Sequence, residues 1–263
     1  TLAGALSLGT IVGPAIAPIM IVDPLGPLGP MLGFALLGGV ALAGAFVCLP
    51  RDRPGAAPVP SGAQNVSLSR VWRRKGIGRH LSFGLLLCSA QAINLYTIGF
   101  VIIDRMADDP MAAQRMIGLA MTLAAAAALL GQWGFVRLFS PSPLTMMRIG
   151  TGFAFAGNGL AVFDGSVQAA ALGFILASFG YGLARPGFSA AASLAGSSED
   201  QVAIASAITF IAGASITLPP VLASAAYQWW RPAPFAIAAA IGGALLLSHL
   251  LPALVRHIVH DER

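Results

Sequence analysis

The stretch Gly9-Thr10-Ile11-Val12-Gly13-Pro14 lies inside an apolar run, Leu2 to Val22, that contains no charged residue. At about 1.5 Å per residue, a helix of this run is long enough to cross the roughly 30 Å of hydrocarbon in a bilayer. Gly9 and Gly13 share one helix face, which leaves a groove where a second helix can approach closely. Pro14 removes a backbone donor and predicts a bend in the middle of the span. The stretch is either a static packing seam of small residues or a groove in which two helices shift against each other.

The composition assigns the whole chain to the same class. Hydrophobic residues make up 57% of the chain and charged residues 10%, and the mean hydropathy is +0.80. These values predict an all-α, polytopic membrane protein. The net charge of +5 does not indicate a nucleic-acid partner, because the basic residues cluster in loops between apolar runs. Cys48 and Cys88 lie in apolar runs without metal-ligand spacing, so we expect no disulfide, no bound metal and no cofactor.

Eight membrane spans are predicted along the chain. They cover residues 2–22, 30–49, 80–103, 116–137, 145–163, 166–195, 202–226 and 233–256. A linker over residues 51–79 is first rich in proline and glycine and then basic, which suits a position along an anionic membrane surface. With this linker in the cytoplasm, the inner segments hold eleven Lys and Arg residues and the outer segments three, leaving out Arg185 within a span. Both ends of the chain are therefore expected on the cytoplasmic side.

The G-x-x-x-G-P pattern of Gly9 to Pro14 resembles the antiporter signature in the fifth helix of drug:proton antiporters of the major facilitator superfamily. The family signature continues with two small residues and a glycine pair. Here the continuation is Ala15-Ile16-Ala17-Pro18, so the glycine pair is absent and only Ala17 keeps a small side chain. The resemblance implies a major facilitator fold of twelve helices and transport by alternating access.

An internal repeat agrees with this resemblance. Residues 30–50 and 234–252 each begin and end with proline, and each carries a central glycine pair, at Gly38-Gly39 and Gly242-Gly243. Major facilitators consist of two six-helix halves related in this parallel way. On this basis residues 1–50 hold the last two helices of the N-terminal half, 51–79 the linker and 80–263 the C-terminal half. The expected eight helices are then the fifth to the twelfth. The first four helices of the same protein are expected to be absent from this chain and to act as its packing partners.

Three later stretches also resemble the family. Gly131 to Pro143 is similar to the second, degenerate copy of its loop signature, without the acidic residue. Phe179 to Ala195 resembles the tenth helix of bacterial multidrug and tetracycline efflux proteins, and Ser197 to Gln201 resembles the turn that follows it. Independently of the family, Ser198 and Gln201 have the spacing of a capping box for the next span.

The residues that could line a substrate cavity come from two spans, which the resemblance places at the central cavity. Gln91 and Asn94 share one face of the span at 80–103, either towards a cavity or in a hydrogen bond between helices. The span at 166–195 carries a single helical stripe that is either a cavity wall or packing. This stripe consists of Phe174, Ser178, Tyr181 and Arg185.

Arg185 is the most specific functional candidate of this stripe. An arginine near the bilayer centre costs roughly 2.5–3.5 kcal/mol on insertion scales. Pro186 and Gly187 follow and are expected to interrupt the helix, which would free the carbonyl of Gly182. A cation beside a broken helix suits an anionic group or a mobile ion pair. Alternatively, the side chain extends to the cytoplasmic headgroups.

These observations predict a non-enzymatic secondary transporter of the inner membrane that exports drugs or other amphipathic molecules in exchange for protons. The alternative is a major facilitator that carries one specific metabolite. Apart from Asp104 at the end of a span, the spans contain no Asp or Glu, and His249 is a proton carrier by residue type only. An intramembrane protease using Ser215 and His249, or a receptor of the same fold, are weaker alternatives.

Overall fold

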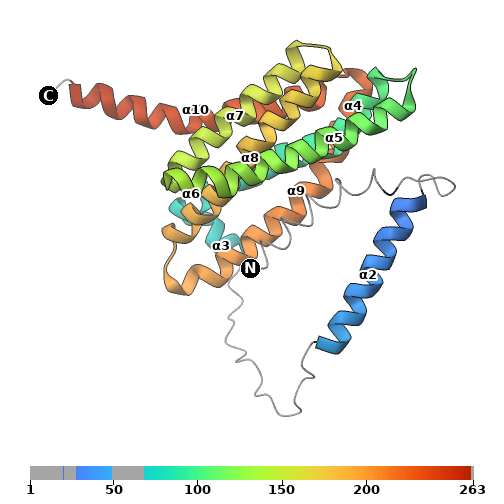
Figure 1. Cartoon of the computed structure of the whole chain (residues 1–263). Helices are drawn as coiled ribbons and strands as arrows, with labels where there is room; N and C mark the ends of the chain where they lie inside the picture. Colours follow the sequence, from blue (N-terminus) through green and yellow to red (C-terminus); the bar gives the residue numbers. More distant parts are fainter. Residues whose placement is uncertain (1–19, 21–27, 49–67, 262–263) are drawn as a thin grey trace. The chain divides into compact units, whose positions relative to one another are not determined.

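The computed structural model describes residues 20, 28–48 and 68–261, and the side chains of all of these except 68, 70, 75 and 249–261 (Figure 1). The chain divides into two units, residues 1–66 and 67–263, which we describe separately. Within the described residues every regular element is helical, as the composition predicts. The expected span at 2–22, with Gly9, Gly13 and Pro14, lies outside the described residues.

The first unit contributes helix α2, Leu28–Cys48, which covers the predicted span at 30–49. Within the helix only Gly29 is buried, and leucine, valine and phenylalanine side chains are exposed all around it. A helix that is apolar on every side is typical of a membrane span or of a helix buried in a large protein.

The second unit contains the remaining helices. Their bounds are α3 Leu68–Arg73, α4 Lys75–Arg105, α5 Pro110–Leu129, π-helical η1 Leu130–Phe135, α6 Val136–Phe139, α7 Pro143–Phe163, α8 Val167–Ala195, 3-10 helical η2 Ser198–Asp200, α9 Gln201–Trp229 and α10 Ala233–Asp261. These helices cover the six predicted spans from 80–103 to 233–256. By length and composition, five helical segments of the described residues could cross a membrane: α2, α4, α5 with η1 and α6, α8, and η2 with α9.

The sequence explains where these helices begin. Asp109 accepts a hydrogen bond from the Ala112 N–H ahead of Pro110, and Ser142 and Ser166 cap α7 and α8 in the same way. Before α9, Ser197 and Asp200 form the capping box, one residue earlier than the predicted pair of Ser198 and Gln201. The prediction was wrong because a 3-10 turn, η2, precedes the α-helix. Gln201 instead donates to the carbonyl oxygens of Ser193 and Ser197.

Glycines bring α7 and α8 into backbone contact. A Cβ atom at Gly150 would lie 2.5 Å from the carbonyl oxygen of Gly180, and Gly157 and Gly173 face each other in the same reciprocal way. The two pairs are seven residues apart on each helix, so they lie on one stripe of each. Any larger residue at these four positions, which we call the glycine seam, would force the helices apart.

Helix α8 is the centre of the second unit. It packs against α7, α5 and α4, and Figure 1 shows it running between α7 and α5. Helix α4 packs in turn against α9 and α10, and α10 against α7. Buried residues from α4, α5, α7, α8 and α10 form one core around Ile102, Ala120, Ala161, Phe174 and Phe235. The faces that point outwards carry large apolar side chains, as lipid contact requires.

Candidate functional site

A buried polar cluster joins α4, α7 and α8. The Asn94 Nδ2 group of α4 donates to Asn158 Oδ1 of α7 at 2.8 Å and contacts the Tyr181 hydroxyl of α8 at 3.3 Å. Asn158 Nδ2 donates to the same hydroxyl at 3.1 Å and to the Ala154 carbonyl oxygen at 2.7 Å. The three side chains are at most 1% exposed. We call Asn94, Asn158 and Tyr181 the polar triad.

The polar triad is not fully satisfied. Asn94 Oδ1 is buried and has no hydrogen-bond partner among the described residues. A buried amide oxygen without a partner costs roughly 1–3 kcal/mol, so such a group is often explained by function. The other buried hydroxyls of α4 and α7, those of Thr97 and Thr151, each donate to their own helix, to the Ile93 and Met147 carbonyl oxygens. The triad therefore keeps one unused acceptor inside the bundle.

The structure places the predicted cavity residues in three environments. Asn94 and Tyr181 meet in the polar triad, as the hydrogen-bonding alternative for Asn94 anticipated. Phe174 is 4% exposed and belongs to the apolar core, and Ser178 is buried on the same helix. Gln91 is half-buried on α4. The polar triad thus joins two of the six predicted residues, and the cavity-lining role of all six stays a prediction.

Arg185 is exposed, and the described residues provide it with no ion pair. Helix α8 continues through Pro186, so the expected interruption of the helix does not occur. Gly187 has a packing role instead, since a Cβ atom there would lie 2.9 Å from the Pro143 carbonyl oxygen. Gly187 therefore allows α7 to approach α8 closely. The sequence pattern was misinterpreted because a glycine at a helix contact and a glycine at a helix break look the same in the sequence.

The acidic side chains in contact with the helix bundle lie at helix ends. Asp200 pairs with Arg74 just before α4 and accepts two hydrogen bonds from Ser197. Near the other end of α4, Asp104 accepts a hydrogen bond of 2.7 Å from the Tyr227 hydroxyl and lies 3.8 Å from Arg231 Nε. Both pairs connect α4 to the ends of α9. In the described part of the chain, no three His, Cys, Asp or Glu side chains come together as metal ligands.

Asn158 is the functional candidate that the sequence reasoning missed. It lies in the run Phe155-Ala156-Gly157-Asn158-Gly159 of an apolar span, so the argument used for Asn94 applies equally to it. The resemblance drew attention to the spans at 80–103 and 166–195 and away from α7. No protein-family model and no curated protein matches the sequence.

Proposed function

We propose that the protein is a secondary active transporter of the major facilitator type, which exports drugs or other amphipathic small molecules in exchange for protons. In this proposal the chain lies in the cell's inner membrane with both ends in the cytoplasm. The twelve-helix organisation and the eight spans of this chain are part of the proposal.

The packing pattern of the second unit supports the proposal most. If α4, α5 and α7 are exchanged for α8, α9 and α10, the main packed pairs map onto one another. The pair of α4 and α9 becomes that of α8 and α5, and the pair of α7 and α8 becomes that of α10 and α4. Because each triplet has an odd number of helices, the second one crosses the membrane in the opposite sense. Such inverted triplets are nested within each six-helix half of major facilitators.

The polar triad has a defined place in this arrangement. Helices α4 and α8 are the first members of the two triplets, and the family resemblance places the walls of the central cavity there. The polar triad joins them through hydrogen bonds that a modest shift of α4 would break. Arg185 lies on the exposed surface of α8, where an anionic group could reach it.

Proton coupling needs a titratable group within the membrane. The described acids nearest the bundle, Asp104 and Asp200, lie at helix ends and already have partners. The proposal therefore places the proton-carrying carboxylate outside residues 28–48 and 68–248.

A second candidate is a transporter of the same type for one specific metabolite. The sequence Ala15-Ile16-Ala17-Pro18 favours it, because the antiporter signature has a glycine pair in this region.

Flux measurements in proteoliposomes test the proposal. The full-length protein is reconstituted, a pH gradient is imposed, and the movement of fluorescent cationic dyes is followed. We expect dye movement that depends on the gradient and stops when an ionophore collapses it. If protein of normal helical content moves no dye under either gradient direction, the antiporter proposal is wrong. Gradient-independent movement of one metabolite would favour the second candidate.

A further inference from the structure

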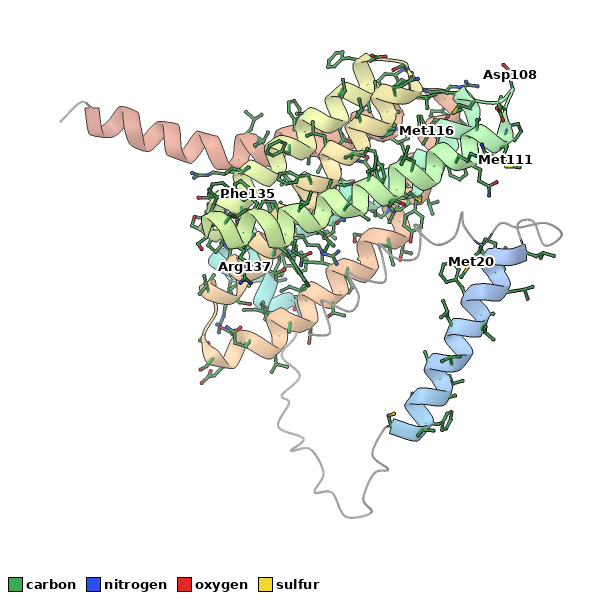
Figure 2. All side chains as sticks on the ribbon, viewed as in Figure 1. Met20, Asp108, Met111, Met116, Phe135 and Arg137 are labelled. Atoms are coloured by element: carbon green, nitrogen blue, oxygen red, sulfur yellow. The ribbon has the colours of Figure 1, made fainter. Side chains whose placement is uncertain are left out.

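A cavity of about 410 Å³ lies between the end of α4 and the beginning of α5. Its lining is apolar except for one amide and includes Ile103, Met106, Ala107, Ala113, Gln114 and Ile117. A cavity of this size lies within the roughly 300–1,000 Å³ typical of small-molecule sites. Figure 2 labels Asp108 in the turn between the two helices, and Met111 and Met116 on α5.

The cavity continues along α4 as an apolar track. Tyr96, Phe100 and Ile103 follow one another at helical spacing on the face that lines the cavity, and each is about half exposed. At Gly99 on the same face, a Cβ atom would meet open space. From Tyr96 to Ala107 the track is about 16 Å long, and it runs from the helix end towards the middle of a candidate span.

The end of the cavity at the α4–α5 turn is acidic. Its turn, residues 106–109, carries Asp108 and Asp109, and Asp109 caps α5 through the Ala112 N–H. Asp108 is exposed and has no hydrogen bond or ion pair with any described residue. The last carbonyl groups of α4 add partial negative charge at the same place, and the capping carboxylate of Asp109 offsets the partial positive charge at the beginning of α5.

The nearby cations point elsewhere. Arg105 donates to the Ser166 carbonyl oxygen at 2.7 Å, towards the beginning of α8. Arg115 lies about 150° around α5 from the cavity, counting 100° per residue. Arg231 lies beside Asp104, which also accepts from Tyr227. The local charge at the cavity therefore favours a cationic group over an anionic one.

We propose that this α4–α5 corner, residues 96–117, binds a membrane phospholipid. The acyl chain lies along the track, and a headgroup that carries an ammonium group lies beside Asp108. A long, straight, half-exposed apolar track suits a flexible alkyl chain. The corner is at the ends of two candidate spans, the depth at which headgroups lie. This binding does not depend on the transport activity proposed above.

Native mass spectrometry of the full chain tests this site with dioleoyl phosphatidylethanolamine and dioleoyl phosphatidylglycerol as probes. We expect the ethanolamine lipid to bind about fivefold more tightly, the effect of roughly one favourable charge interaction. Asp108→Asn should remove this preference, whereas Glu199→Gln, another exposed acid, should not. Ile117→Trp should fill the cavity and weaken both lipids, whereas Leu119→Trp on the opposite side of α5 should weaken neither.

Equal binding of the two lipids by the parent protein would overturn the headgroup assignment. Unchanged binding by Ile117→Trp, measured on protein of parental helical content, would overturn the site itself. If Ile117→Trp does not fold, Asp108→Asn still decides, because the Asp108 side chain is exposed and has no partner among the described residues. A retained preference would refute the proposal.

Discussion

The α7–α8 hairpin and the α4–α5 corner are both antiparallel helix pairs joined by short turns, yet they pack in opposite ways. In the hairpin, Gly150 and Gly157 meet Gly180 and Gly173 backbone to backbone. In the corner, larger side chains such as Ile103 and Ile117 face each other and leave a cavity. Small residues at the contact therefore accompany the tight seam, and large residues accompany the cavity.

The largest effect is expected from breaking the glycine seam. Gly157→Leu would force a side chain into the Gly173 carbonyl oxygen, and overpacking of this kind costs about 3 kcal/mol or more when backbone must move. Thermal unfolding in detergent should show a large loss of stability or no folded protein. Gly159→Leu is the matched control, since a Cβ atom at Gly159 meets open space. Equal behaviour of the two variants would refute the seam.

A smaller loss is expected when the polar triad is cut. Asn158→Leu leaves the Asn94 amide and the Tyr181 hydroxyl without a shared partner, which should cost roughly 1–3 kcal/mol of unfolding free energy. The double variant Asn94→Leu with Asn158→Leu should cost less than the sum of the two single variants, because no orphaned amide remains and only the Tyr181 hydroxyl loses its partners. If the two single effects simply add, the side chains do not act as a unit.

Removing the Asp200 carboxylate should have a modest effect. Asp200→Ala loses both the capping box with Ser197 and the pair with Arg74, and loss of a cap typically costs about 1 kcal/mol. Arg74→Ala should cost less, because its side chain is half exposed and solvent screens the pair. Chemical denaturation of both variants measures the order, and a larger effect for Arg74→Ala would contradict it.

The smallest effect on stability is expected at Arg185, whose side chain is exposed. Its role would instead appear in transport. Under the proposed function, Arg185→Ala should reduce flux strongly and Arg185→Lys only slightly, because positive charge is the property required. Parental flux in the alanine variant would show that the side chain serves only to reach the headgroups.

Hydropathy predicted the helices well, because a long apolar run has few alternatives to a helix in a membrane. The seven predicted spans within the described residues all coincide with helices, with ends that differ by several residues. Helix contacts were harder to predict. Gly187 was interpreted as part of a helix break, whereas it allows α7 to pack closely against α8. The sequence pattern of one helix does not show which helix packs against it.

The candidate site was predicted only in part, because it depends on contacts between helices. The cost of an unpartnered amide in hydrocarbon pointed to Asn94, and it pointed equally to Asn158. That the two amides meet at Tyr181 depends on how α4, α7 and α8 pack. This packing depends on the glycine seam and on contacts between residues far apart in the sequence.

Hydrogen exchange by mass spectrometry in lipid nanodiscs tests the contrast between seam and corner most directly. Amides in Gly150–Ala161 and Gly173–Ala184, on the glycine seam, should exchange slowest in the second unit, because backbone contact leaves no room for local opening. Amides in Pro110–Ile117, beside the cavity, should exchange clearly faster. Equal exchange in both regions, or faster exchange in the glycine seam, would contradict the account.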